Sequence, residues 1–190
     1  MIHRAPGMSE AATKSGLADQ PATLAHPAAI WGVFGFVLIL GQALYRLTPL
    51  ALEPIQSGEL LWWQWGLYGV SMLFNGYSEG YKAFQLQVAP RVVARANHLA
   101  KEPRLLHVLF APLFCMCLFH ATKKRLIVSW SVYVGIIALI ILVRKLPQPY
   151  RGIVDAGVVL GLSWGVVAIV ATYVQGLRGH LPDASPCLPE

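Results

Sequence analysis

The stretch between Trp62 and Lys82 carries a row of polar side chains in a segment that is otherwise apolar enough to cross a membrane. An α-helix turns about 100° per residue, so these side chains fall within about 80° of one another and form one stripe. Amide, hydroxyl and carboxylate groups inside a membrane bind cations, relay protons or hydrogen-bond to neighbouring helices. The members of this polar stripe are Gln64, Tyr68, Ser71, Asn75, Glu79 and Lys82.

The polar stripe has two explanations. An unpaired amide or carboxylate is costly in lipid, so in both explanations the stripe faces protein or confined water. In the first, Ser71 and Asn75 bridge to neighbouring helices, and Glu79 pairs at the membrane boundary with the lysine one turn later. In the second, the stripe lines a wet groove in which Glu79 and Asp155 bind or relay a cation. The sequence leaves both explanations open.

A second group of chemically capable residues lies in the run CMCLFH, residues 115–120. Thiol, thioether and imidazole groups suit a soft ion such as Cu(I), and Cys117 and His120 are the candidate metal ligands. His107 and His120 also raise the question of haem. On one continuous helix they lie about 220° apart around the axis, so they would not ligate the same haem. The sequence requires no cofactor.

The composition is that of a membrane protein. The chain has 190 residues, of which 56% are hydrophobic and 13% charged, with a mean hydropathy of +0.54. An average soluble domain has roughly one quarter charged residues. The net charge of +6 is therefore read as an orientation signal in membrane loops, and no nucleic-acid partner is expected. The chain also lacks phosphate-binding loops, nucleophile elbows and zinc-protease motifs.

Five segments are long enough to cross the hydrocarbon, which takes about 20 apolar residues. Lipid offers no partner for free backbone groups, so each should be a helix, and the expected fold is an all-α, polytopic integral membrane bundle. The expected spans are 28–47, 60–80, 105–121, 126–143 and 152–176. Together they form one domain, 28–177, between polar tails at 1–27 and 178–190. The third span is the shortest and contains Pro112.

Residues 90–102 are expected to form an amphipathic interfacial helix between the second and third spans. Pro90 suits a helix start and Pro103 a stop. Its basic residues, Arg91, Arg95 and Lys101, would contact lipid headgroups or an acidic surface of a partner.

Two files of glycine favour close helix packing. The first is in the second span and the other, continued by Ala168 and Thr172, is in the fifth span. Small side chains let a neighbouring backbone approach closely, so both files are expected to be helix contacts. They consist of Gly66, Gly69, Gly76 and Gly80, and of Gly157, Gly161 and Gly165.

The distribution of Lys and Arg predicts the orientation. With five spans, the side that holds the N-terminus has more of these residues, so the N-terminus should be cytoplasmic and the C-terminus outside. The cluster Lys123, Lys124 and Arg125 opposes this orientation. The charge bias and the lack of a targeting peptide fit a bacterial inner membrane.

Three functions fit these features. The first is a non-catalytic accessory, structural or assembly subunit of a larger membrane complex, which contacts lipid and other membrane subunits or copies of itself. The second is a small oligomeric cation or proton channel or transporter that uses Asn75 and Glu79. The third is a membrane redox or lipid-modifying enzyme with a metal or haem at His107, Cys117 and His120.

Overall fold

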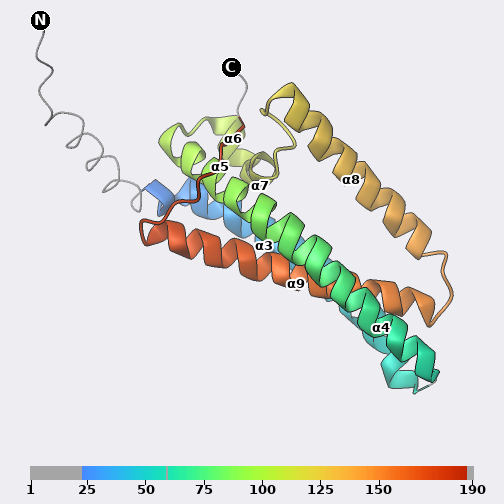
Figure 1. The fold of residues 1–190 in the computed structure, drawn as a ribbon. Helices are drawn as coiled ribbons and strands as arrows, with labels where there is room; N and C mark the ends of the chain where they lie inside the picture. The colour runs from blue at the N-terminus through green and yellow to red at the C-terminus, as the bar shows by residue number, and fades with distance from the viewer. Residues whose placement is uncertain (1–22, 59, 188–190) are drawn as a thin grey trace, which may run out of the picture.

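The computed structural model describes residues 23–58 and 60–187, and these residues form helices with no strand among them. The expected all-α class is therefore confirmed. The elements are α3 (Pro27–Ser57), α4 (Trp62–Asn75), η1 (Gly76–Val88), α5 (Ala89–Lys101), α6 (Leu105–Leu109), α7 (Ala111–Cys115), α8 (Lys123–Val143) and α9 (Tyr150–Leu177). The π-helix η1 joins α4 to α5, so these three elements form one long rod (Figure 1).

Three of these helices are long and apolar enough to cross a membrane: α3, α8 and α9. Their apolar windows have mean hydropathies of 1.8, 2.7 and 2.2, respectively. In α8 only 6% of that window is buried within the chain. A helix that exposes apolar side chains on all sides needs an apolar surrounding. The protein is therefore membrane-embedded, but the expected number of five spans is not confirmed.

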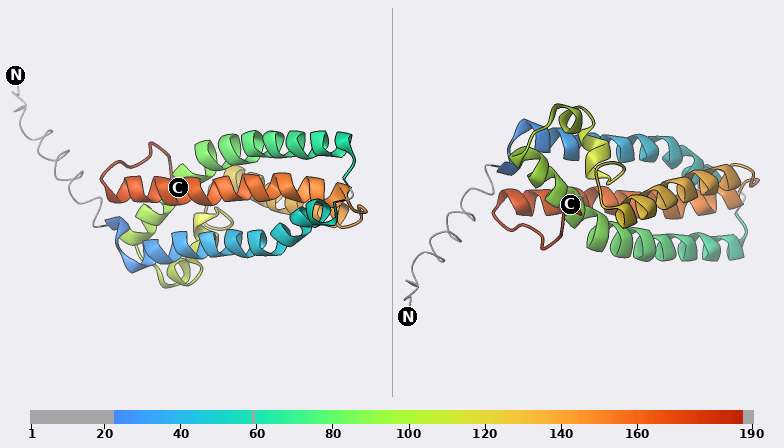
Figure 2. Two further views of the ribbon diagram at one scale, coloured as in Figure 1. Left: turned by 90° about the horizontal axis from the view of Figure 1, so that it is seen from below. Right: turned by 90° about the horizontal axis from the view of Figure 1, so that it is seen from above.

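Helix α9 lies between α3 and the rod (Figure 2). It runs antiparallel to α3, because Tyr173 near the end of α9 donates a hydrogen bond to the carbonyl of Leu24 (2.7 Å). It runs parallel to the rod, because Gly157 lies beside Asn75 and Gly165 beside Phe84. We call the end of the bundle that holds α5, α6, α7 and the start of α8 the basic end, and the end that holds Trp62, Trp63 and Tyr150 the tryptophan end.

The expected third span, 105–121, is wrong as a single transmembrane helix. It forms two five-residue helices, α6 and α7, whereas a crossing helix needs about 17 residues or more. The chain breaks at Phe110 and then turns after α7, where Cys117 and His120 have positive φ angles of 60° and 50°. Pro112 has no backbone N–H to continue the hydrogen bonding from α6. This segment therefore stays at the basic end.

The first helix is longer than expected. It continues past Leu47 through Pro49 and Pro54, so most of the predicted loop after residue 47 is helical. The helix bends along this part, as expected where proline removes backbone hydrogen bonds (Figure 2). It ends at Gly58, which adopts a left-handed conformation with a φ of 69°.

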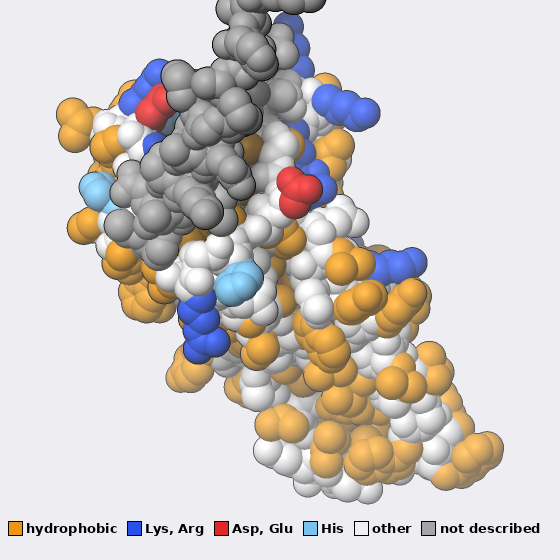
Figure 3. Space-filling view, turned by 60° about the vertical axis from the view of Figure 1, so that its left-hand side comes forward, with side chains coloured by type: hydrophobic (Ala, Val, Ile, Leu, Met, Phe, Trp, Pro, Cys, Tyr) orange, Lys and Arg blue, Asp and Glu red, His pale blue; other side chains and the backbone are white. Residues whose placement is uncertain are grey.

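The loss of the third span affects where the first and last described residues lie. The first described residues and the last lie at the same end, because Gly176 contacts Leu24 and the carbonyl of Pro186 accepts a hydrogen bond from Arg95 of α5. The expected placement of the N-terminus inside and the C-terminus outside is therefore not supported by the positions of these residues. One face of the molecule shows Lys and Arg side chains toward this basic end and mainly apolar side chains toward the other (Figure 3).

Candidate functional site

The polar stripe of the rod packs against the glycine file of α9. A methyl group at Gly157 would lie 2.7 Å from the backbone oxygen of Ser71, and one at Gly161 would lie 3.0 Å from Glu79 Oε2. These distances show that the polar side chains fill the space that the two glycines leave open. The sequence identified both surfaces but did not show that each is the partner of the other.

The rod also offers glycines to larger side chains of α9. Gly76 of the rod lies against Leu160, and Gly80 lies against Trp164. Each helix therefore offers glycines to the larger side chains of the other. Trp164 also donates a hydrogen bond from its indole Nε1 to Gln85 Oε1 (2.8 Å). The predicted close packing is present along this contact, and it lies within the chain.

Glu79 and Lys82 point to different surroundings. Glu79 lies against α9, whereas Lys82 is exposed, with its ammonium 5.1 Å from the centre of the Tyr77 ring. The 100° step used to align them holds for an α-helix, but both residues lie in η1. A π-helix closes its hydrogen bonds over five residues, so it turns less per residue and residues three apart no longer align. The expected pairing of Glu79 with Lys82 is absent among the described ion pairs.

The first two polar residues of the stripe hold the tryptophan end together. Gln64 is 5% exposed, and its Oε1 accepts a hydrogen bond from the backbone N–H of Leu61 (2.8 Å) at the start of α4. The Tyr68 hydroxyl donates to the carbonyl of Ala51 in α3 (2.6 Å). Further along, the Asn75 amide donates to the carbonyl of Ser71 in its own helix (2.9 Å). These bonds satisfy polar groups without a bound ligand.

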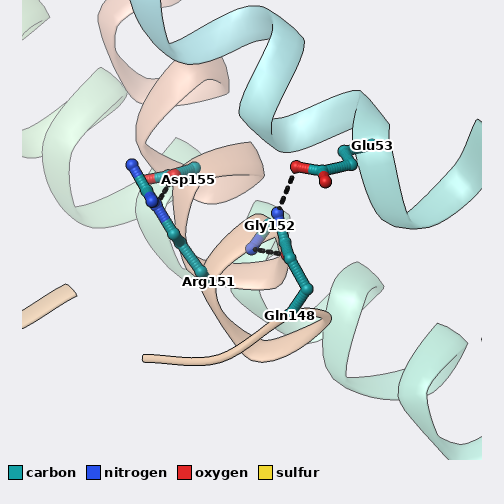
Figure 4. Close-up of polar contacts among 5 residues, drawn as sticks. All are labelled: Glu53, Gln148, Arg151, Gly152 and Asp155. Carbon is teal, nitrogen blue, oxygen red and sulfur yellow. Dashed lines mark hydrogen bonds and ion pairs between the residues drawn. The ribbon is translucent and has the colours of Figure 1, made fainter. Parts of the chain in front are cut away.

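Asp155 lies apart from Glu79. It is six residues before Gly161 in α9, which is about 9 Å along the helix axis. The residue is 5% exposed, and its carboxylate lies 3.6 Å from Arg151 Nε of the preceding turn (Figure 4). Beside this pair, Gln148 donates to Glu53 (2.7 Å) and accepts from the N–H of Gly152 (3.0 Å). Asp155 is therefore part of a polar group at the tryptophan end.

Arg95 is the largest fully buried side chain of the described residues, with 0% exposed. The expectation that it contacts lipid headgroups was wrong for this chain. Its guanidinium lies 4.0 Å from the centre of the Phe114 ring, a cation–π contact. It donates to four carbonyls: Phe114 (2.6 Å), Pro186 (2.8 Å), Phe119 (3.1 Å) and His120 (2.9 Å).

The burial of Arg95 has a signal in the sequence that was missed. Arg95 is three residues after Val92 and four before Leu99, which places it within the apolar face of α5. This face packs into the protein core rather than onto lipid. Burial lowers the pKa of Arg95, and the nearby Cys117 raises it in part. An arginine begins from so high a pKa that it stays charged. Arg91 and Lys101 are not on the buried face.

The two candidate haem ligands, His107 and His120, are closer together than the sequence implied. The rings of His107 and His120 have centroids 4.5 Å apart, and both pack near Phe114. The 220° separation assumed one continuous helix, and the turn after α7 removes that assumption. Within residues 23–58 and 60–187, no group of three or more His, Cys, Asp or Glu side chains has an arrangement that could hold a metal ion. Cys117 and His120 therefore lack a third protein ligand of these types there.

Gly66 and Gly69 do not join the packed contact. A methyl group at either would meet nothing within 4 Å, so this half of the predicted glycine face is open. Gly69 lies in a groove of about 470 Å³ between α3, α4 and α9. The groove is mostly apolar, and its neighbouring residues include Trp65 and Tyr68.

No protein-family model, no curated protein and no solved structure matches this chain.

Proposed function

We propose that this protein is a non-catalytic subunit of a larger membrane complex and that the outer face of η1 contacts another protein chain. The observation that carries the proposal is that two polar side chains of η1, Lys82 and Gln87, are exposed near the middle of the bundle's length. The inner face of η1 packs on Gly161 and Gly165. Both glycines are near the middle of α9, a helix that qualifies as a membrane span.

Without a neighbouring chain, Lys82 and Gln87 would be exposed at the depth where lipid is most apolar. A charged side chain at the bilayer centre costs about 2.5–3.5 kcal/mol on insertion scales. A neighbouring protein chain lowers this cost by offering hydrogen bonds or an opposite charge. The exposed apolar helix α8, by contrast, is suited to lipid. The proposal therefore assigns protein to the outer face of η1 and lipid to α8.

Photo-crosslinking tests this assignment directly. We expect benzoylphenylalanine at position 82 to crosslink to another protein in intact membranes, because the side chain lies in an interface. The matched control is the same probe at position 137 of α8, where Ile137 is 41% exposed; there we expect crosslinks to lipid only. Mass spectrometry of the crosslinked band identifies the partner.

The crosslinked species decides between outcomes. A different membrane protein at position 82 supports the subunit proposal. A second copy of this chain shows self-assembly and favours the channel alternative. Crosslinks to lipid at both positions contradict the proposed interface.

The two alternative functions have less support from the geometry. In a channel or transporter, Asn75 and Glu79 would line a water-filled route, but both lie against glycines of α9 in the same chain. For a redox or lipid-modifying enzyme, the meeting of His107 and His120 is favourable. That enzyme would still need metal ligands beyond the described groups, or a partner that supplies them.

We also propose that the basic end faces the cytoplasm. Lys and Arg residues favour the cytoplasmic side in the short connections of membrane proteins. Four crossings, by α3, the rod, α8 and α9, put Lys123, Lys124 and Arg125 on the basic side, so the cluster no longer opposes the orientation. The N-terminus is then cytoplasmic, and a bacterial inner membrane remains the proposed location. The described Lys and Arg residues near the basic end are Arg91, Arg95, Lys101, Arg104, Lys123, Lys124, Arg125 and Arg178, and those near the tryptophan end are Arg46, Arg144, Lys145 and Arg151.

Reporter fusions in a bacterial host measure the orientation. We expect alkaline phosphatase to be active when fused after Leu146 and inactive when fused at the C-terminus, because only the tryptophan end would lie outside. Green fluorescent protein at the two positions should give the reverse pattern. A five-span arrangement with the N-terminus inside would give an active phosphatase at the C-terminus and an inactive one after Leu146.

A further inference from the structure

A polar pocket of about 200 Å³ lies at the tryptophan end, between the last turns of α3, the start of α4 and the segment just before α9. We call it the Glu53 pocket. Its polar side chains are Glu53, Ser57, Gln64 and Gln148, and Glu53 is the one charged residue among its described lining residues. The pocket shares no lining residue with the apolar groove around Gly69. It is therefore a separate site with an acidic wall.

Glu53 is held in position, but its charge has no partner in the described part of the chain. Gln148 donates to Glu53 Oε2 (2.7 Å), and its own Oε1 accepts from the backbone N–H of Gly152 (3.0 Å), as Figure 4 shows. Because a backbone N–H can only donate, the second bond fixes which end of the amide faces the carboxylate. Glu53 makes no ion pair among the described residues, and its Oε1 has no hydrogen-bond partner there. Gln148 thus acts as a positioning residue, and the carboxylate can accept from a cation.

Gln64 supplies a buried donor that the described chain does not use. The residue is 5% exposed, and its Oε1 accepts from the backbone N–H of Leu61 (2.8 Å), so its Nε2 is the end of the amide that is left over. Nε2 has no hydrogen-bond partner among the described residues, yet it is not one of the solvent-inaccessible polar atoms there. Since Gln64 lines the pocket, this amide group opens into it. An unused donor in a buried residue is costly, and an acceptor oxygen on a ligand removes the cost.

These groups together favour a ligand with an ammonium donor and an oxygen acceptor. The Glu53 carboxylate accepts strongly from an ammonium N–H, because both partners are charged. Ser57 donates its own hydroxyl proton to the carbonyl of Pro54 (3.1 Å), so its oxygen can also accept from the ligand. A metal cation fits less well, because the amide nitrogen of Gln64 has no lone pair with which to coordinate it.

The level of the pocket in the membrane indicates the source of the ammonium group. The tryptophan end holds Trp62, Trp63 and Tyr150, and such side chains gather where the hydrocarbon meets the lipid headgroups. Phosphatidylethanolamine carries a primary ammonium a short distance from a phosphate ester oxygen, so it has both the donor and the acceptor. The pocket volume is several times the roughly 30 Å³ of one water molecule in the liquid, which is enough for this part of a headgroup.

We propose that the Glu53 pocket binds the ammonium group of a phosphatidylethanolamine headgroup. The ammonium donates to Glu53, and the adjoining phosphate ester oxygen accepts from Gln64 Nε2. This site is at the other end of α4 from η1, so it is separate from the proposed protein contact of η1 and does not depend on it.

Native mass spectrometry of the full-length protein in mild detergent tests the site, with lipids that have identical acyl chains. We expect phosphatidylethanolamine to be retained in preference to phosphatidylcholine at equal concentration. The two lipids have the same net charge, but the quaternary ammonium of phosphatidylcholine has no N–H to donate. Glu53→Gln should weaken phosphatidylethanolamine binding about tenfold, as expected for the loss of one hydrogen bond between charged groups. It should change phosphatidylcholine binding less than twofold.

The matched control is Gln56→Leu, which removes an exposed polar side chain from the same turn of α3 but outside the pocket. It should change phosphatidylethanolamine binding less than twofold. Free ethanolamine is added in a separate arm to distinguish a soluble amine from a lipid, and we expect no displacement of the lipid at millimolar concentration. Equal retention of the two lipids by the wild-type protein, unchanged binding in Glu53→Gln, an equal loss in Gln56→Leu, or displacement by ethanolamine overturns the proposal.

Discussion

Replacing Arg95 with methionine is expected to lower the free energy of unfolding by about 3 kcal/mol or more, because buried carbonyls lose a charged donor. The side chain is 0% exposed and binds carbonyls from α7, from the segment before α8 and from the C-terminal residues. Methionine fills much of the volume but donates no hydrogen bond. Chemical unfolding of the purified protein in mild detergent, followed by circular dichroism, gives the difference.

Two further measurements separate the role of Arg95 from a general effect of charge. Arg95→Lys keeps the charge but loses the planar fork, so it should fall between the wild type and Arg95→Met. Lys101→Met removes an exposed charge from the same helix and should change stability by less than about 0.5 kcal/mol. We also expect trypsin to cleave after Lys123, Lys124 or Arg125 faster in Arg95→Met, because the start of α8 is released. Unchanged stability and unchanged cleavage would show that Arg95 does not hold this segment.

Replacing Gly157 with leucine is expected to force α9 away from the rod and to lower the free energy of unfolding by about 3 kcal/mol or more, at or above the upper range for overpacking. The first added carbon would lie 2.7 Å from the backbone oxygen of Ser71, so the helices themselves must separate. A flexible side chain turning aside would not relieve this contact. Unfolding in detergent measures the loss, and crosslinking between cysteines placed in α4 and α9 reports the separation.

Gly69→Leu is the matched control for this substitution. Gly69 is also a helical glycine, but a methyl group there would meet nothing within 4 Å. We expect the free energy of unfolding of Gly69→Leu to stay within about 1 kcal/mol of the wild-type value, since helix propensity favours leucine over glycine. A similar loss in both variants would mean that leucine is tolerated poorly for reasons other than the contact with α9, and the proposed packing of the stripe on the glycine file would be contradicted.

The glycine contact shows how far periodicity could predict the site. The spacing of Gly157, Gly161 and Gly165 and the polar stripe each identified a buried face, because small and polar residues in apolar helices avoid lipid. That these faces meet depends on α9 running parallel to the rod with Glu79 beside Gly161. Such an alignment is set by contacts between residues about 80 positions apart, which a local pattern does not contain.

The same limit explains why the sequence wrongly predicted a third span. Residues 105–121 are apolar, so hydropathy alone favoured a crossing helix. The tertiary structure provides another solution, because Arg95 donates hydrogen bonds to the carbonyls of Phe114, Phe119 and His120, and these bonds offset the cost of burying its charge. In a continuous helix the Phe114 carbonyl would instead have accepted a hydrogen bond from an N–H of that helix. The competing donor lies 19 to 25 residues away in sequence, and nothing within the segment reveals it.

The sequence by itself determined the membrane class, the helical character and the faces that avoid lipid, because hydropathy and periodicity are properties of neighbouring residues. Only the tertiary structure decided that Arg95 is buried, that the segment after α5 stays at one end, and that the polar stripe meets glycines of its own chain. These features depend on hydrogen-bond partners and close contacts from distant segments, so they arise only when the helices are assembled.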